Sequence, residues 1–239
     1  MALESLYREP QATQAGPINW PALELHDVFK IYRSGPVETV ALRGVDLEVR
    51  KGQLVAILGP SGCGKSTLLA LAAGLDRPSA GDVRAFGDSL EMLSEMELAS
   101  YRSRIGIVFQ SENLWSALSA HENVAIALRL AGLERATERA REALNELGLG
   151  DRAEHRVAAL SGGEQQRVAI CAAVARQAPL VLADEPTGEL DVANELVVLE
   201  MLRHLPVELG CAVVVVTHSD AVAAAAHRVV ELRDGKVVG

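Results

Sequence analysis

Runs of apolar residues predict the strands of this chain. Residues 23–32 (LELHDVFKIY) and 39–50 (TVALRGVDLEVR) alternate apolar and polar positions, as half-buried strands do. Three shorter runs are almost wholly apolar, and they are LVAIL (54–58), LVLAD (180–184) and AVVVVTH (212–218). Short continuous apolar runs are typical of strands that are buried on both faces of a parallel sheet. The pattern therefore predicts an α/β domain.

Helical spacing dominates the middle of the chain. Residues 89–102, 120–133 and 136–149 place apolar side chains on one helical face and charged side chains on the other, with a short strand candidate at 105–110 (IGIVFQ). A helical lobe inserted into the sheet domain, at about 88–165, is the simplest interpretation. The last residues, HRVVELRDGKVVG, predict a hairpin that turns at Asp234 and Gly235.

Composition and charge narrow the function classes. The 239 residues are 49% hydrophobic with a formal net charge of -9, which argues against a nucleic-acid-binding surface. No apolar run reaches the roughly 20 residues that span a bilayer. Residues 1–20 are polar and contain two prolines, so we expect a loosely ordered extension rather than a signal or transit peptide. Cys63, Cys171 and Cys211 form no metal or disulfide pattern, which favours a reducing cytoplasm.

A glycine-rich loop follows the LVAIL strand and opens the next helix. GPSGCGKST (59–67) satisfies the pattern G-x-x-x-x-G-K-S/T through Gly59, Gly64, Lys65 and Ser66. Glycines let backbone N–H groups wrap phosphate oxygens, the Lys65 ammonium faces the β and γ phosphates, and the Ser66 hydroxyl can bind Mg²⁺. A chance glycine turn is the alternative, but the strand and helix around the loop favour a nucleoside triphosphate site.

Two adjacent carboxylates end the LVLAD strand. After a phosphate loop, Asp184 is the expected outer partner of Mg²⁺, and Glu185 can polarise the water that attacks the γ phosphate. The alternative for Glu185 is a solvated charge at the end of a strand. A GTPase would need an N-K-x-D segment that reads the base, and the sequence contains none.

A second candidate anion site lies at ALSGGEQQR (159–167). Ser161 and the glycines after it begin a helix, so bare backbone N–H groups at its positive end could face an anion. An ordinary capping box between Ser161 and Glu164 is the alternative, and it is compatible with anion binding.

Together these segments resemble the nucleotide-binding subunit of an ATP-binding-cassette (ABC) transporter over residues 23–239. The resemblance implies a P-loop NTPase fold with a mixed central sheet, an antiparallel β subdomain and the inserted helical subdomain, within an ABC ATPase domain at 21–239. It also implies a head-to-tail dimer in which the LSGGE helix start of one subunit binds the γ phosphate held by its mate. A homodimer is expected, and the residues implied to act across it are Ser161, Gly162, Gly163, Glu164 and Asp191.

The family assigns further roles to residues that would be unremarkable alone. Without the family, Gln110 and His218 would be interpreted as ordinary residues at strand ends, and Tyr32 as a half-buried packing residue. The resemblance implies that Gln110 contacts Mg²⁺ and the attacking water. It also implies that His218 hydrogen-bonds the γ phosphate and that Tyr32 stacks on adenine. The implied catalytic residues are Lys65, Gln110, Glu185 and His218, and the implied Mg²⁺ ligands are Ser66, Gln110 and Asp184. The implied nucleotide-binding residues are Tyr32, Gly59, Pro60, Ser61, Gly62, Cys63, Gly64, Lys65, Ser66, Thr67 and Gln110.

Two positions bear on partners. In the branch of the family that this chain most resembles, the segment usually reads ADEPTGNLD. Here Glu189 replaces the asparagine, which adds a carboxylate near the expected dimer interface. Trp115 lies just past Gln110, where the family docks its membrane partner, and is either core or an exposed anchor.

The branch most similar to this chain contains lipoprotein-releasing, macrolide-exporting and cell-division cassettes (LolD-, MacB- and FtsE-like). It implies an ATP- and Mg²⁺-dependent ATPase at the cytoplasmic face of the inner membrane that drives a permease of the FtsX/MacB type by export or by mechanical force. A regulatory ATPase that controls a cell-envelope enzyme through an FtsX-like partner is the alternative. A ribosome-acting ABC protein would carry two cassettes, and a DNA-repair ATPase would carry a long coiled coil between its motifs, so both are disfavoured.

Overall fold

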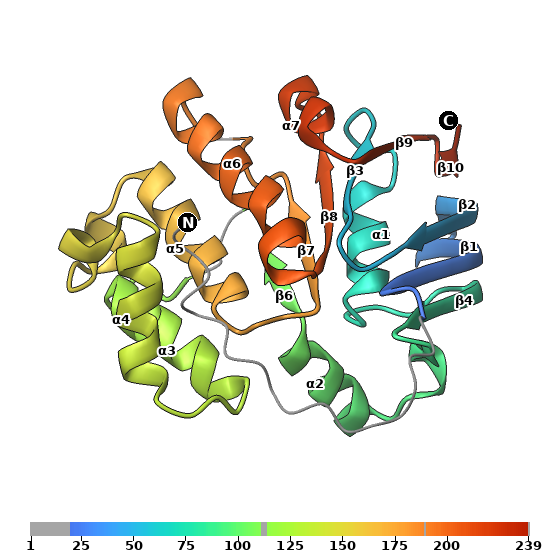
Figure 1. Cartoon of the computed structure of the whole chain (residues 1–239). Coiled ribbons are helices and arrows are strands. Elements are labelled where there is room, and N and C mark those ends of the chain that lie inside the picture. Colours follow the sequence, from blue (N-terminus) through green and yellow to red (C-terminus); the bar gives the residue numbers. More distant parts are fainter. Residues whose placement is uncertain (1–19, 111–113, 189, 239) are drawn as a thin grey trace.

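The computed structural model describes residues 20–110, 114–188 and 190–238 (Figure 1). The predicted N-terminal extension, apart from Trp20, and the unusual Glu189 lie outside these described residues. No helix within the described ranges is long and apolar enough to cross a bilayer.

A six-stranded sheet forms the centre, in the order β10-β9-β3-β8-β7-β6. All of its neighbouring strands pair in parallel except the terminal β9–β10 hairpin, which turns at Asp234 and Gly235 as predicted. Its strands are β3 (Leu54–Leu58), β6 (Gly106–Val108), β7 (Leu180–Asp184), β8 (Ala212–Thr217), β9 (Arg228–Arg233) and β10 (Lys236–Val237). The neighbouring strands β3, β8 and β7 point the same way, so their carboxyl ends share one edge, where ligands of such sheets bind.

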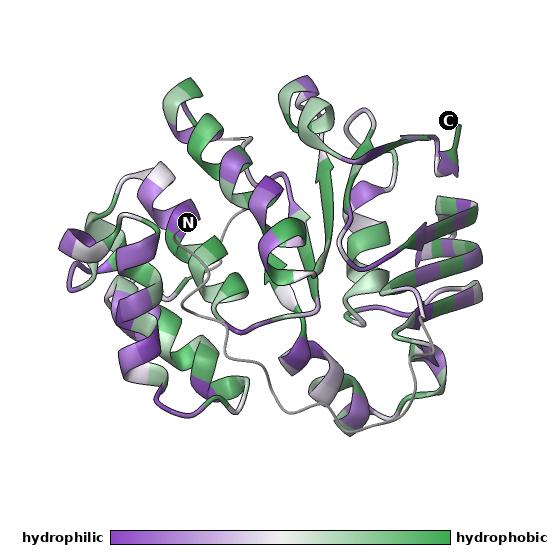
Figure 2. Ribbon diagram, in the orientation of Figure 1, coloured by the Kyte–Doolittle hydropathy of each residue, from purple (hydrophilic) through white to green (hydrophobic). Residues whose placement is uncertain are grey.

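Burial on both faces explains why the central strands are continuously apolar. In β8, Val213 and Val215 belong to one core cluster, whereas Val214 and Val216 belong to the cluster on the opposite face. Figure 2 shows the contrast between the hydrophobic central strands and the striped strands of the second sheet.

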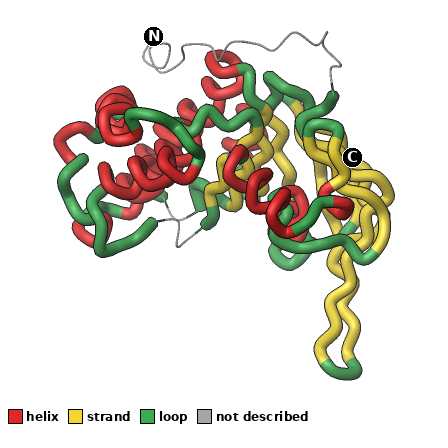
Figure 3. The backbone as a smooth tube through the Cα atoms, turned by 90° about the horizontal axis from the view of Figure 1, so that it is seen from below, coloured by secondary structure: helices red, strands yellow, loops and turns green. Residues whose placement is uncertain are grey.

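The second sheet is antiparallel, in the order β2-β1-β4-β5. Its strands are β1 (Leu23–Ser34), β2 (Val37–Val49), β4 (Ala80–Ala85) and β5 (Asp88–Ser89). β4 pairs with β1 only between Leu23 and Phe29, so the far ends of β1 and β2 continue as a two-stranded ribbon. Figure 3 shows this ribbon projecting from the body of the molecule.

Seven α-helices and three short 3₁₀ turns are described. The helices are α1 (Lys65–Ala72), α2 (Glu95–Arg104), α3 (Ala120–Leu130), α4 (Ala136–Glu146), α5 (Gly162–Val174), α6 (Val192–Leu209) and α7 (Asp220–Ala225), and the turns are η2 (Leu90–Met92), η3 (Gly150–Arg152) and η4 (Val157–Ala159). Capping boxes at Ser94, Ser119 and Ser161 begin α2, α3 and α5. α1 differs, because its cap is Gly64 and no side chain caps its first turn.

The middle of the chain divides between two packing environments. α3, α4 and one face of α5 enclose their own core, which contains Leu128, Leu144 and Val168. α2 instead packs Leu98 and Tyr101 into the core of the two sheets, and the Tyr101 hydroxyl donates to the Ala72 carbonyl at 2.6 Å. The division at 21–239, with a helical subdomain at about 88–165, stays a prediction.

Candidate functional site

The loop between β3 and α1 is pressed against its neighbours at two glycines. A Cβ on Gly59 would come within 2.2 Å of the Leu232 carbonyl oxygen, and one on Gly64 within 2.4 Å of the Ala41 carbonyl oxygen. Gly64 also has a φ of 107°, which L side chains rarely adopt. With Gly64 as its cap, α1 begins without a side-chain acceptor on its first N–H groups. These groups and the helix dipole are suited to bind an anion.

Lys65, the first residue of α1, places a buried cation in this loop. Its side chain folds back so that Nζ donates to the carbonyls of Gly59 at 2.8 Å and Pro60 at 3.1 Å. Nζ also lies 3.9 Å from Oε1 of Glu185. Only 7% of Lys65 is exposed, so its charge acts in a partly desolvated environment where Coulomb attraction is stronger than in water.

Asp184 and Glu185 leave the end of β7 beside the loop. Burial, followed by the charge of Glu185, raises the pKa of Asp184, although a hydrogen bond from Ser66 and the charge of Lys65 oppose the shift. The net rise reflects chiefly the burial of the carboxylate, which the hydrogen bond from Ser66 and the charge of Lys65 do not fully offset.

Glu185 is held in a strained conformation by neighbours on β8 and just after its end. Its φ is 46°, in the left-handed region that non-glycine residues seldom occupy, and its N–H donates to the Val216 carbonyl at 2.9 Å. Oε2 accepts from the His218 N–H at 3.2 Å and lies 2.9 Å from Nδ1 of the same residue. The carboxylate is therefore fixed at the edge of the site, with the more exposed His218 ring beside it.

An open cleft of about 720 Å³ lies above the loop. Ten predicted site residues line it, and they are Tyr32, Ser61, Gly62, Gly64, Lys65, Ser66, Thr67, Gln110, Glu185 and His218. Gly59, Pro60 and Cys63 do not line it, and Asp184 lines a small neighbouring cavity that Ser66 shares. Cys63 is 5% exposed and its side chain belongs to the core of the two sheets, while its N–H donates to the Pro60 carbonyl at 3.3 Å and its carbonyl accepts from the Gly235 N–H at 3.0 Å.

The Ser161 helix start lies elsewhere. Ser161 Oγ accepts from the Glu164 N–H at 3.3 Å, and Glu164 Oε2 accepts from the Ser161 N–H at 2.8 Å, so the capping box is formed. The Ser161 backbone N–H and then Arg152 hydrogen-bond to the carboxylate and lower the pKa of Glu164 to about 2. Asp191 caps α6, accepting from the Asn194 N–H at 2.9 Å. Neither Asp191 nor residues 161–164 are among the described residues that line the cleft.

Residues 42–188 match the family model described as ABC transporter. The chain belongs to the ABC transporter family. It is 45% identical to the lipoprotein-releasing system ATP-binding protein LolD of Chromohalobacter salexigens, over 90% of this chain and 92% of the relative. It is 42% identical to the macrolide export ATP-binding/permease protein MacB of an Azoarcus species, over 96% of this chain but 35% of that longer protein.

A solved ABC cassette has the same fold. The dimeric structure of a post-hydrolysis ATP-binding cassette with bound ADP and Pi superposes with a TM-score of 0.85 at 39% identity, over 91% of this chain and 97% of that one. This chain therefore has the ABC ATPase fold predicted from its motifs, binds ATP, and is an ATPase.

The oxygen donors of this ABC ATPase fit Mg²⁺, a hard cation held largely by phosphate and water oxygens. The Ser66 hydroxyl and the Asp184 carboxylate adjoin, and Glu185 adds negative charge beside them. Within the described ranges no three His, Cys, Asp or Glu side chains gather as a closed metal site. The donor set thus suits a cation that arrives with the nucleotide.

The end of the ABC cleft at Tyr32 includes residues that the motifs did not indicate. Thr39, Val40 and Ala41 line it. Thr39 is the strand partner of Tyr32, so the two-residue turn between Ser34 and Val37 could have located it from the sequence.

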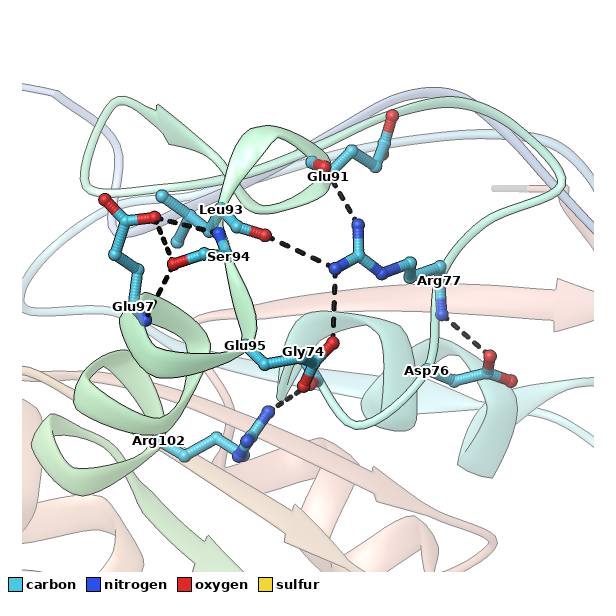
Figure 4. Close-up of polar contacts among 9 residues, drawn as sticks. All are labelled: Gly74, Asp76, Arg77, Glu91, Leu93, Ser94, Glu95, Glu97 and Arg102. Carbon is cyan, nitrogen blue, oxygen red and sulfur yellow. Dashed lines mark hydrogen bonds and ion pairs between the residues drawn. The ribbon is translucent and has the colours of Figure 1, made fainter.

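Asp76, which the sequence motifs also did not indicate, holds the Tyr32 ring. Tyr32 Oη donates to Asp76 Oδ2 at 3.1 Å, and Lys30 Nζ lies 2.6 Å from Oδ1 of Asp76 and 4.9 Å from the centre of the ring. Burial raises the pKa of Asp76, but hydrogen bonds from Lys30, the Arg77 N–H and Tyr32 together lower it by more. The pKa of Asp76 therefore lies below its usual value. Figure 4 shows the next link, in which the Arg77 guanidinium donates to the Glu91 and Leu93 carbonyls and ties this corner to η2 and the segment just before α2.

Proposed function

We propose that this chain is the nucleotide-binding subunit of an ABC transporter that closes head to tail on a second copy around two ATP molecules. The observation that carries the proposal is the separation of two anion-binding helix starts. α1 begins inside the cleft, whereas α5 begins outside it with Gly162 facing open space among the described residues. A symmetric dimer would bring the α5 start of one protomer over the cleft of its partner. The dimeric cassette with ADP and Pi supports this arrangement.

Within one protomer we assign the nucleotide contacts to the loop and the ribbon. In the loop from Gly59 to Thr67 every residue except Pro60 has a backbone N–H, and these groups and the Lys65 ammonium bind the phosphates. Tyr32 stacks on adenine. Ser66, Gln110 and Asp184 would hold Mg²⁺, which supplies positive charge against the triphosphate.

Glu185 is the proposed general base for hydrolysis. Its carboxylate lines the cleft, and His218 fixes Oε2. Oε1, 3.9 Å from Lys65 Nζ, faces the phosphate-binding side. There it can accept a proton from the water that attacks the γ phosphate, while His218 contacts that phosphate.

A membrane permease of the FtsX/MacB type is the proposed partner, at the cytoplasmic face of the inner membrane. The names of the LolD and MacB relatives support a role in export or force transmission. Leu75, Phe109 and Trp115 are 50%, 44% and 55% exposed, and Leu75 and Phe109 line one small cavity beside β6. Exposed apolar side chains near Gln110 are suited to receive a permease segment.

A variant that binds but does not hydrolyse ATP tests the dimer. We expect Glu185→Gln to lower the hydrolysis rate by about a thousandfold, the order of a lost catalytic base, and to trap an ATP-bound dimer. Size-exclusion chromatography with light scattering should show the mass doubling with ATP and not with ADP. The control Lys65→Ala in the same background should stay monomeric. A Glu185→Gln protein that stays monomeric at saturating ATP would contradict the proposal.

A further inference from the structure

Asn194 connects the two segments that are proposed to face the partner. It lies in the first turn of α6, three residues after Asp191. Its Nδ2 donates to Asp191 Oδ2 at 3.0 Å, and its Oδ1 accepts from Arg167 Nη1 of α5 at 2.8 Å. Both ends of one amide are thus bonded, one to the start of α6 and the other to α5.

The same amide occupies the space beside Gly163. A Cβ at Gly163 would come within 2.4 Å of Asn194 Cγ and 2.5 Å of Oδ1. Asn194 cannot swing aside without giving up its bonds to Arg167 and Asp191. Gly163 has an ordinary helical conformation, so its lack of a side chain serves this contact and not an unusual φ.

The neighbouring Gly162 is different. No described atom lies within 4 Å of a Cβ placed there. Nothing described within this protomer therefore requires glycine at 162, whereas Asn194 requires it at 163. The two glycines of LSGG therefore have different surroundings. The first faces outward, and the second faces α6.

We propose that Asn194 is a positioning residue that locks the start of α5 to Asp191, so that both segments reach the partner protomer as one rigid unit. This inference rests on the proposed head-to-tail dimer. It explains the lack of a side chain at Gly163 by packing against Asn194 inside the protomer, and it leaves the backbone N–H groups of Gly162 and Gly163 at the helix start that faces the partner.

An isosteric change tests the lock without altering its shape. Asn194→Asp keeps the acceptor for Arg167 but sets an oxygen against Asp191 in place of the donor. In the Glu185→Gln background we expect about tenfold weaker ATP-driven dimerisation, the order of a lost hydrogen bond to a charged group. ATP affinity of the monomer, measured by titration below the dimerisation concentration, should not change. If the parent dimerises and Asn194→Asp dimerises equally well, the inference is overturned; if the parent itself fails to dimerise, the proposed function has failed instead.

Suppression at Gly163 gives a second, independent readout. Gly163→Ala should dimerise less well than Asn194→Ala, and the Gly163→Ala/Asn194→Ala double variant should recover to the level of Asn194→Ala alone. Adding Asn194→Ala to Gly162→Ala should not improve the dimerisation of that variant. The inference is wrong if Gly163→Ala has no defect, if Asn194→Ala fails to relieve it, or if Gly162→Ala is relieved equally.

Discussion

Asp76 shows how one carboxylate organises the end of the cleft where adenine is expected. It accepts the Tyr32 hydroxyl hydrogen bond, pairs with Lys30 and accepts from the Arg77 N–H at 2.7 Å. Tyr32 lies on the projecting ribbon, beyond the part of β1 that β4 supports. Its ring is therefore held in place from the side, by Asp76 and Lys30.

Removing the charge of Asp76 should loosen that ring. We expect Asp76→Asn to weaken ATP binding about fivefold, corresponding to roughly 1 kcal/mol for an exposed charged hydrogen bond, while the hydrolysis rate at saturating ATP stays nearly constant. Steady-state kinetics would then show a raised KM at unchanged kcat. Asp82→Asn is the matched control, because Asp82 pairs with Arg84 and Ser89 away from the cleft. Tyr32→Phe combined with Asp76→Asn should add nothing further, and fully additive effects would contradict the link.

At the scale of elements, three of the seven described helices begin with the same capping box, and α1 is among the four that do not. Ser94, Ser119 and Ser161 cap α2, α3 and α5, each with a glutamate three residues later. Among the described helices, only α1 has a glycine as its N-cap, and no side chain accepts from its first N–H groups, which leaves them available to a ligand. The box at Ser161 therefore stabilises α5 in the single protomer, and a partner's phosphate would approach a helix start that is already ordered.

Comparing two of these caps separates stability from function. Ser119→Ala and Ser161→Ala should each lower the free energy of unfolding by about 1 kcal/mol, the usual cost of losing an N-cap hydroxyl. Only Ser161→Ala should also weaken ATP-driven dimerisation of the Glu185→Gln protein. Urea unfolding and light scattering would measure the two effects. A loss of dimerisation in both variants would show that helix stability alone sets the affinity.

The sequence could predict those features whose residues lie close together along the chain. The loop at 59–67 and the Asp184–Glu185 pair are continuous segments beside strong strand signals, so their positions follow from the motif. Asp76 lies 44 residues from Tyr32, and Asn194 lies 27 residues from Arg167. Such contacts exist only after β1 has packed against the end of α1 and α5 against α6, and no periodicity in one chain reveals them.

At the scale of the whole molecule, the proposed dimer has two sites, each built from the loop of one protomer and the α5 start of the other. One substitution in the loop and one at the α5 start can therefore be placed either in the same protomer or in opposite protomers. The two arrangements contain the same substitutions but damage different numbers of sites.

Differently tagged protomers in the Glu185→Gln background test this arrangement. A heterodimer of Lys65→Ala with Ser161→Arg puts both defects in one site and leaves the other intact, so it should trap one ATP. A Lys65→Ala/Ser161→Arg double variant paired with the parent damages both sites and should trap none. Tandem purification with labelled ATP counts the bound nucleotide, and equal trapping in both arrangements would refute shared sites.

The left-handed backbone of Glu185 has an evolutionary consequence. A glycine at this position would adopt that φ of 46° with less strain, but it would remove the carboxylate that we propose as the general base. Selection for stability alone would therefore favour glycine here, and the proposed catalytic role is the reason we expect a glutamate to be kept in this strained conformation.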